Sequence, residues 1–346
     1  MGANPLSDDD CNAALNALAK FDGNVTEAAK SLKLNRDTFR GRIAAATLRQ
    51  PSLVKTATVE LPVFPDDDIP VSEIIGMMEK RFNKRSEHKT STKWFPIKIK
   101  DNKPIGIAFM GDPHVDDDGC NWPLLRKHCE IMNQDGIYGV NIGDTTNNWG
   151  GRLVAQFANQ ETSQKTAHKL AKWLMLDSGI KWLCWLMGNH ELNWNEGPAI
   201  LRAMGGAKIP MHDWQAQFKL VFPNGVETKI WANHNFAGHS MWNTLHGGQK
   251  TAHMKEQAHI YVCGHHHNWA LHQEESGSKD FYYWLARCRG YKYLDSYAEL
   301  HGHYPQQDGA TILAVINPAK KGVNHVLCFA DLEAGAKYLK YLRAAK

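Results

Sequence analysis

The sequence predicts an α/β protein with a small all-α unit at its N-terminus, and three observations lead to this prediction. From Ile105 onward, apolar runs alternate with helical segments, as in strands joined by crossover helices. Residues 50–70 contain four of the 14 prolines, which excludes a continuous helix and predicts an extended linker. Histidine and tryptophan are unevenly placed, because only His88 of 18 histidines precedes residue 105 and no tryptophan precedes Trp94.

These boundaries divide the 346 residues into four parts. We expect a helical domain at 1–50, a Pro-rich linker at 51–70, a helix and basic stretch at 71–100, and an α/β domain at 101–346. The basic stretch holds eight lysines and arginines between Lys80 and Lys100. We interpret it as a solvated helix face that leads into a first strand, in preference to a groove for nucleic acid.

Composition excludes several classes of protein. The longest apolar stretches are far shorter than the roughly 20 residues that span a bilayer, and the acidic first ten residues lack the apolar segment of a secretory signal. Seven cysteines without a C-x-x-C pair argue against a disulfide framework or a thiolate zinc site. We therefore expect a cytoplasmic protein with buried free thiols and no membrane association. The net charge of +4 does not identify a partner by itself.

The first domain shows the pattern of short amphipathic helices. A helix at 7–19 places Ala14, Leu15 and Leu18 on one face. In the run GNVTEAAKSLKLNRDTFRGRI at 23–43, Asn24 and Asn35 are expected to cap two further helices that a tight turn connects. Two such helices, with alanines that allow a close crossing, predict a helix-turn-helix.

The same run is similar to the Fis-type helix-turn-helix, with which it shares G-N-x-T-x-A-A and N-R-x-T-F-R. The resemblance implies DNA as a partner and a homodimer. The recognition helix would carry Arg36, Thr38, Arg40 and Arg42. Between Asn24 and Arg49, six basic side chains outnumber two acidic ones, which suits contacts with phosphates. A helical docking or oligomerisation module is the alternative.

Five apolar runs of the fourth part each end in a turn that carries side chains able to bind a metal. The turns hold Asp112 and His114; Asp144; Asn189, His190 and Glu191; His234; and His265, His266 and His267. Because ligands of α/β proteins gather beyond the carboxyl ends of the strands, we expect these five turns to converge. One such turn is unremarkable, whereas five in succession predict a metal site.

The series D-x-H, G-D, G-N-H-E, H and G-H-x-H resembles, in this order, the motifs of the calcineurin-like metallophosphoesterases over about residues 105–330. The resemblance implies a four-layer α/β/β/α sandwich and two metal sites that share Asp144. One site would be held by Asp112, His114, Asp144 and His267, and the other by Asp144, Asn189, His234 and His265.

The resemblance also implies a hydrolase in which a metal-bridged hydroxide attacks phosphorus in line while His190 acts as the general acid. Two cations suit this reaction because they bring an anionic phosphate and its nucleophile together and lower the pKa of water. Imidazole and carboxylate ligands without thiolates suit Mn²⁺, Fe, Zn²⁺ or Ni²⁺. We expect two divalent metal ions and favour Mn²⁺.

Departures from related motifs narrow the substrate. Asn147 stands where protein phosphatases carry the second aspartate of G-D-x-x-D-R-G, which disfavours a protein phosphatase. The compact motif set is similar to that of SbcD-type nucleases and of phosphodiesterases, so we expect phosphodiester hydrolysis on DNA. Two alternatives are a phosphomonoesterase or a phosphodiesterase for small cyclic nucleotides or dinucleotides, and a DNA-binding regulator that uses the phosphoesterase fold as an interaction module. The segment at 281–309 resembles a tail of phage-encoded members of the metallophosphoesterase superfamily. A phage-encoded protein would be located in the cytoplasm of its host.

Three assignments near these motifs depend on placement alone. His239 competes with His234 for the fourth motif, and we favour His234 because it directly follows an apolar run. His266 lies between two expected ligands and should point away from the site. Three aspartates at 116–118 follow D-x-H, and we expect them to form a solvated acidic loop in preference to supporting the metal ligands.

Overall fold

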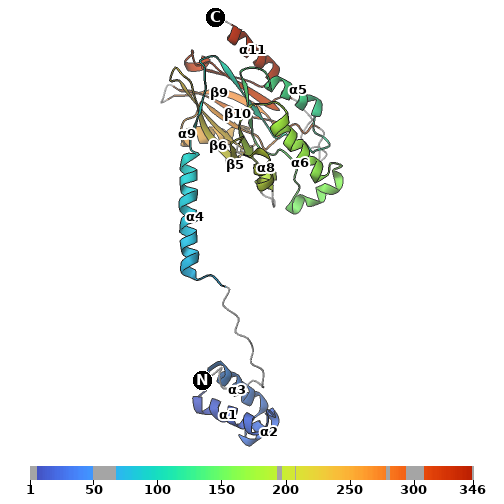
Figure 1. The fold of residues 1–346 in the computed structure, drawn as a ribbon, viewed down its shortest axis with the longest axis vertical. Coiled ribbons are helices and arrows are strands. Elements are labelled where there is room, and N and C mark those ends of the chain that lie inside the picture. Colours follow the sequence, from blue (N-terminus) through green and yellow to red (C-terminus); the bar gives the residue numbers. More distant parts are fainter. Residues whose placement is uncertain are drawn as a thin grey trace. The chain divides into compact units, whose positions relative to one another are not determined.

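The computed structural model describes residues 6–49, 68–192, 197–206, 208–277, 281–293 and 308–344 (Figure 1). The chain divides into two compact units, 1–74 and 75–346. Most of the expected linker at 51–70 lies outside the described residues, as do residues 294–307 of the tail-like segment.

The N-terminal unit contains the three helices expected from the sequence. They are α1 (Asp8–Lys20), α2 (Val25–Ser31) and α3 (Arg36–Arg49). The Asn24 side chain accepts hydrogen bonds from the first turn of α2, and Asn35 Oδ1 accepts one from the Thr38 backbone at 2.7 Å, so both residues cap helices as expected. The three helices surround a small core that includes Ala14, Ala28 and Phe39.

Helix α4 (Val71–Ser91) contains no buried residue, and β1 (Phe95–Lys98) follows it. The helix expected in the part at 71–100 is therefore present and covers Val71–Ser91. The basic stretch lies on the exposed surface of this helix and continues into the strand, which agrees with the expectation of a solvated face.

The larger unit is a mixed α/β structure with two six-stranded sheets among its described residues. In sheet A the strand order is β1-β6-β7-β8-β10-β9, and in sheet B it is β12-β11-β2-β3-β4-β5. The further strands of sheet A are β6 (Gln215–Val221), β7 (Glu227–Asn233), β8 (Ile260–Cys263), β9 (Ala270–Ser276) and β10 (Phe281–Arg287). Those of sheet B are β2 (Ile105–Met110), β3 (Ile137–Asn141), β4 (Trp182–Met187), β5 (Met211–Asp213), β11 (Thr311–Ile316) and β12 (Val326–Phe329).

Parallel pairing brings the carboxyl ends of the central strands together. In sheet B, β2 pairs with β3 and β3 with β4, both in parallel. In sheet A, β7 pairs in parallel with β8. Antiparallel pairs such as β9–β10 and β11–β12 complete the sheets, so both sheets are mixed. The turns that follow each group of parallel strands therefore lie at the same edge of their sheet.

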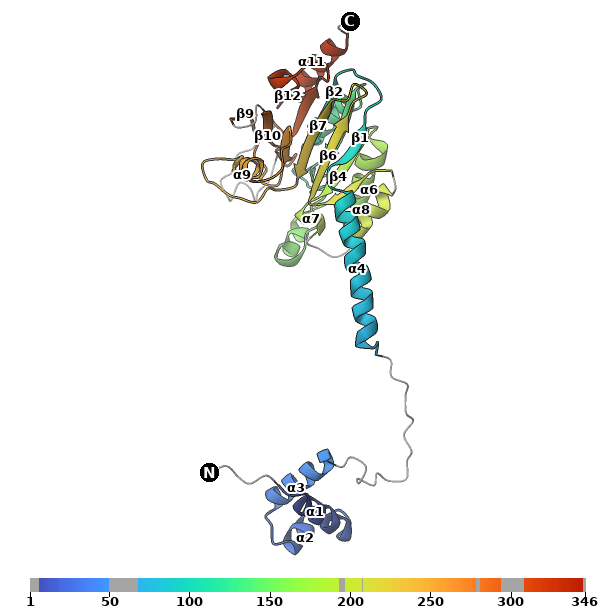
Figure 2. The ribbon, with the colours of Figure 1, turned by 90° about the vertical axis from the view of Figure 1, so that its left-hand side faces the viewer.

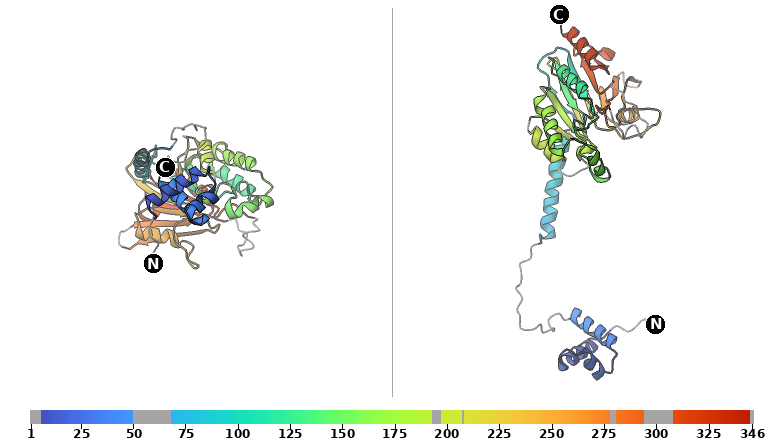
Figure 3. Two further views of the ribbon diagram at one scale, coloured as in Figure 1. Left: turned by 90° about the horizontal axis from the view of Figure 1, so that it is seen from below. Right: turned by 90° about the vertical axis from the view of Figure 1, so that its right-hand side faces the viewer.

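One buried apolar cluster contains residues of both sheets. Helices lie beside the sheets in the ribbon views (Figures 2 and 3). Phe109 and Val140 of sheet B belong to the same buried cluster as Phe218 and Ile230 of sheet A. Helices α5 (Trp122–Met132), α6 (Gln164–Lys172) and α11 (Leu332–Ala344) pack with a second cluster on sheet B. Helix α9 (His246–Met254) adjoins a third cluster that includes Tyr261 of sheet A. The other helices of this unit are η2 (Gly151–Asn159), η3 (Trp173–Asp177), α7 (Asn189–Leu192), α8 (Gly197–Gly205) and η4 (Gly322–Asn324).

Two expectations from composition can be compared with the structure. All seven cysteines are buried free thiols, as expected. Within the described ranges, no helix combines the length and the apolarity needed to cross a bilayer.

Candidate metal centre

The five motif turns follow five strand ends, as the sequence pattern predicts. Asp112 and His114 follow β2, Asp144 follows β3, and Asn189 and His190 follow β4 in sheet B. His234 follows β7 directly, and His265 and His267 follow β8 in sheet A. Strands of both sheets therefore carry the expected ligands to one place.

The backbone is strained at most of these positions. Five of the seven expected metal ligands have positive φ, namely Asp112, His114, Asp144, His265 and His267, with values between 27° and 71°. L-residues seldom adopt this region, and such strain gathers at functional sites, where the surrounding structure holds it in place. The turns thus aim these side chains in directions that relaxed strand ends would not give.

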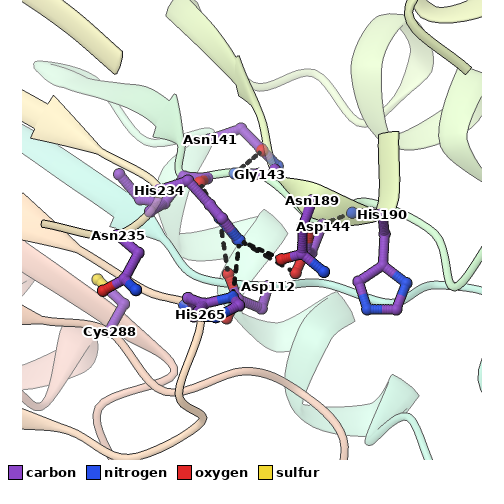
Figure 4. Close-up of polar contacts among 12 residues, drawn as sticks. Asp112, Asn141, Gly143, Asp144, Asn189, His190, His234, Asn235, His265 and Cys288 are labelled. Atoms are coloured by element: carbon purple, nitrogen blue, oxygen red, sulfur yellow. Dashed lines mark hydrogen bonds and ion pairs between the residues drawn. The ribbon is translucent and has the colours of Figure 1, made fainter. Parts of the chain in front are cut away.

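His234 lies at the centre of one half of the cluster (Figure 4). Its Nε2 is 2.9 Å from Asn189 Oδ1, 3.2 Å from His265 Nδ1 and 3.2 Å from Asp144 Oδ2. Its Nδ1 lies 3.0 Å from the carbonyl oxygen of Ile142, which keeps Nε2 directed at the other three side chains. These four side chains are the set expected for one metal.

The other half of the cluster gathers around Asp112 and His114. Asp112 Oδ2 is 3.5 Å from His267 Nε2, and the His114 and His267 rings are 5.1 Å apart. Asp112 Oδ1 and His114 Nε2 are both buried, and neither has a hydrogen-bond partner among the described residues. Buried polar atoms are normally hydrogen-bonded, so two such atoms on ligand-type side chains fit a site built for a cation.

Asp144 belongs to both halves. Its carboxylate oxygens lie within 4.8 Å of ligand atoms of His234 and His265 in one group and of His114 and His190 in another. His190 is therefore close enough to share the cluster, although the resemblance implies the role of a general acid for it. Figure 4 shows the His190 ring on the opposite side of Asp144 and Asn189 from His234 and His265.

The hydrogen bonds of His114 and His190 orient both rings. His114 Nδ1 is 2.8 Å from Asn147 Oδ1, so Nε2 faces the cluster. His190 Nδ1 is hydrogen-bonded to the carbonyl oxygen of the same Asn147, and the His190 backbone N–H donates to Asp144 Oδ1 at 3.0 Å. One residue, Asn147, thus sets the direction of two histidines of the site.

The charges of the centre depend on one another. Burial raises the pKa of Asp112 to about 8, with the His234 ring opposing this shift and the Asp144 carboxylate adding to it. Burial also acts against ionisation of Asp144, but His234, His190 and His114 outweigh it and hold the pKa of Asp144 well below its usual range. Burial would lower the pKa of His234, yet Asp144 and Asp112 raise it to about 10. Buried carboxylates that face imidazole rings suit neutralisation by divalent cations.

Cysteine sulfur does not take part in this donor set. Cys288 lies beside the cluster in Figure 4, and its thiol donates a hydrogen bond to the carbonyl oxygen of Phe109. Burial raises the pKa of Cys288 well above its usual value, and Cys288 belongs to neither group of ligand-type side chains around Asp144. The donors at the centre are therefore nitrogen and oxygen atoms.

Glu191 lies in one of the five motif turns, but the sequence gave it no place in either expected set of metal ligands. It is 1% exposed, and its carboxylate accepts hydrogen bonds from the backbone N–H groups of Asp144 (3.1 Å), Thr145 (2.6 Å) and Gly188 (2.8 Å). The side chain thereby ties the turn after β3 to the turn after β4. Its place in G-N-H-E was the available signal, but two of its backbone partners, Asp144 and Thr145, lie 47 and 46 residues away in the chain.

The expectation of a solvated acidic loop at 116–118 is wrong for Asp116. This residue is 2% exposed, and its carboxylate accepts hydrogen bonds from the Asn147 backbone N–H (2.7 Å) and from Gln160 Nε2 (3.1 Å). Asp117 Oδ2 accepts a hydrogen bond from Asn147 Nδ2 at 2.8 Å and lies 3.0 Å from Lys292 Nζ. The two aspartates therefore support Asn147, which orients His114.

His239 and His266 lie outside the cluster. His239 is exposed, and its ring is 6.4 Å from that of His266, which is itself exposed. The structure thus brings His234 and not His239 to the other ligand-type side chains. His266 points away from the cluster, as its place between His265 and His267 suggested.

The expected DNA-contacting residues all lie on α3, but they differ in their surroundings. Arg36, Thr38 and Arg40 are exposed. Arg42 Nη1 instead forms an ion pair with Asp10 Oδ1 of α1 at 2.8 Å, and its side chain is 23% exposed. This pair holds Arg42 against α1 inside the N-terminal unit.

Comparison with known proteins leaves the chain without an assigned family. No protein-family model matches the sequence, and no curated protein does. Among solved structures, the chain is similar to "GAP50 the anchor in the inner membrane complex of Plasmodium", with a TM-score of 0.32 and 11% sequence identity over 69% of this chain and 95% of that chain. A likeness this weak carries no argument about fold family or function.

Proposed function

We propose that the chain is a hydrolase of phosphodiesters in DNA that depends on two divalent metal ions. One observation carries this proposal: five strand-end turns place a buried histidine–carboxylate cluster around Asp144, which belongs to two groups of ligand-type side chains. The proposal includes a four-layer α/β/β/α sandwich, with helices outside each of two facing sheets. The cytoplasmic location remains part of the same proposal.

The donor set supports two neighbouring cations. Asp112, His114, Asp144 and His267 would hold one ion, and Asp144, Asn189, His234 and His265 would hold the other. Nitrogen and oxygen donors suit Mn²⁺, which we favour, and also Fe, Zn²⁺ or Ni²⁺. When bound, such a pair of ions supplies positive charge for a phosphoryl oxygen and lowers the pKa of water.

The chain's own residues would do three further tasks. Asp144 would keep the two ions adjacent, since its carboxylate contributes to both groups. Asn147 and the Ile142 carbonyl would fix the ring directions of His114 and His234. His190 would donate a proton from Nε2 to the leaving oxygen, because its Nδ1 is engaged by the Asn147 carbonyl.

Features of the N-terminal unit support DNA as the substrate. Its second and third helices are capped by Asn24 and Asn35 in the manner expected of a helix-turn-helix. Arg36 and Arg40 are exposed on α3, where cationic side chains can contact phosphates. We propose that this unit binds DNA and that the chain acts as a homodimer.

The test compares two histidines of the same loop region. In wild type, metal removal should abolish hydrolysis of bis(p-nitrophenyl) phosphate and of DNA, and Mn²⁺ should restore it. His234→Ala should lose bound metal and activity, whereas His239→Ala, the matched control, should retain the metal-to-protein ratio of wild type. Activity that survives chelation, or equal effects of the two substitutions, would contradict the proposal. Faster hydrolysis of the mono-ester than of the di-ester would favour a phosphomonoesterase.

A further inference from the structure

The loop between β7 and α9 exposes two large apolar side chains close to the metal centre. Trp242 is 93% exposed and Met241 is 83% exposed. Tryptophan gains more than most residues from burial, so an indole held in water offers a large surface for a ligand. Figure 2 shows this loop extending from sheet A beside α9.

Hydrogen bonds fix the backbone that carries Trp242. Ser240 Oγ accepts the backbone N–H groups of Trp242 at 3.2 Å and of Asn243 at 3.1 Å. Asn243 Nδ2 donates to Gln249 Oε1 of α9 at 2.8 Å, and Asn243 Oδ1 accepts the Leu245 N–H at 2.9 Å. The indole therefore projects from an ordered turn that is attached to α9.

A short chain of rings connects this loop to the metal centre. The His239 ring lies 6.4 Å from that of His266, whose ring lies 4.7 Å from that of His265. Trp242 is three residues after His239, so their Cα atoms are at most about 11 Å apart. A nucleotide chain that continues from a phosphate at the cluster can reach the indole.

We propose that Trp242 is a positioning residue whose indole stacks on a base of the DNA strand next to the phosphodiester that is hydrolysed. This inference rests on the proposed function. Stacking suits the site because every base has a π face, so an aromatic side chain can hold a strand without selecting its sequence. Met241, which precedes Trp242 in the chain, has no planar face and cannot stack on a base in its place.

The test measures binding of a single-stranded tetranucleotide to the full chain with Mn²⁺ present. His190→Asn is the background, chosen to slow hydrolysis during titration calorimetry. A single strand offers no major groove to a recognition helix, so the N-terminal unit should contribute little. Trp242→Ala should weaken binding roughly 5- to 100-fold, the effect of losing one stacked base. Trp242→Phe should retain most of the affinity, and Met241→Ala is the matched control.

Tetranucleotides with one abasic position make the test specific for stacking. At one of the positions, loss of the base should weaken binding to the protein with Trp242 and should have little further effect on Trp242→Ala. The inference is overturned if Trp242→Ala weakens the intact and every abasic strand equally, or weakens neither. Hydrolysis by the chain with native His190 is measured in parallel. Its absence would count against the proposed function alone, because the binding cycle does not require turnover.

Discussion

Asp144 Oδ2 lies 3.2 Å from His234 Nε2, and this contact joins a residue after β3 of sheet B to a residue after β7 of sheet A. Both side chains are almost fully buried, and neither has an arginine or lysine beside it among its principal charged neighbours. The contact marks where the carboxyl ends of strands from the two sheets meet. Predictions about the metal centre follow from this shared position.

Asp144→Asn should remove both metal ions. The substitution keeps the size of the side chain but removes the charge that contributes to both groups of ligand-type side chains. We expect the metal-to-protein ratio, measured by plasma emission spectroscopy after dialysis against Mn²⁺, to fall from about two to near zero. His265→Ala, which changes one group only, should retain about one ion. Loss of a single ion in Asp144→Asn would show that the carboxylate does not bridge.

Gly188→Ala should disrupt the centre through packing alone. A Cβ at Gly188 would lie 2.6 Å from His234 Cε1 and closer still to Asp144 Oδ1. Both side chains would have to move, so we expect loss of metal affinity and destabilisation of about 1–3 kcal/mol, measured by urea unfolding.

Gly41→Ala is the control for this substitution. Gly41 lies in α3, and an added Cβ would meet nothing within 4 Å. Alanine favours the helix by roughly 0.5–1 kcal/mol over glycine, so this variant should be as stable as wild type or more stable. Wild-type metal affinity in Gly188→Ala would show that the cluster can relax around a methyl group.

The strand ends and their turns could be predicted from the sequence because the signal is local. An apolar run followed by Gly-Asp or Gly-Asn-His places a ligand-type side chain at the end of a strand whatever its neighbours are. The preference for His234 over His239 had the same basis, and the structure brings His234 to the cluster. Convergence of the turns followed from one general property of parallel strands.

Contacts between distant segments could not be predicted in this way. Asp116 is buried because Gln160 and Asn147 reach it from 44 and 31 residues away. Arg42 is paired because α1 brings Asp10 beside it. Likewise β1 pairs in parallel with β6, a partner that follows it by more than one hundred residues. Each case depends on tertiary neighbours that a pattern along the chain does not show.

Glu191→Gln should weaken the turns that hold the metal centre while leaving the metal ligands themselves in place. The carboxylate accepts three backbone N–H groups, whereas an amide offers one oxygen and turns its own N–H₂ toward a donor. We expect destabilisation of about 1–3 kcal/mol by urea unfolding and weaker metal binding. Excess Mn²⁺ should restore most activity, because the ligands themselves remain. Wild-type stability would contradict the role of Glu191 as the link between the two turns.

Two half-buried histidines away from the centre predict loss of stability in acid. Burial lowers the pKa of His128 and of His259 to about 4, and nearby cationic groups add to the shift. The unfolded chain binds these protons below about pH 6.5, whereas the folded chain does not until about pH 4. The free energy of unfolding should therefore fall as pH drops from 6.5 to 4, by up to about 3 kcal/mol for each group.

Urea unfolding at several pH values tests the predicted fall in the free energy of unfolding, and EDTA in the buffer removes any contribution from metal binding. His128→Gln should reduce the pH dependence in that window, and His259→Gln should do so separately. The two effects should add, because the residues lie in different parts of the fold. A slope that neither substitution changes would mean that other groups cause the acid sensitivity.

Arg36→Ala and Arg40→Ala should weaken binding of duplex DNA, whereas Arg42→Ala should act on stability. Arg36 and Arg40 are exposed on α3, but Arg42 is paired with Asp10. Each lost phosphate contact should reduce the slope of log affinity against log salt concentration by about 1, as measured by fluorescence anisotropy. Arg42→Ala should lower the melting temperature and keep the wild-type slope. Unchanged binding in the Arg36→Ala/Arg40→Ala double variant would favour a docking or oligomerisation role for the N-terminal unit, because a recognition helix cannot lose its exposed cations without losing affinity.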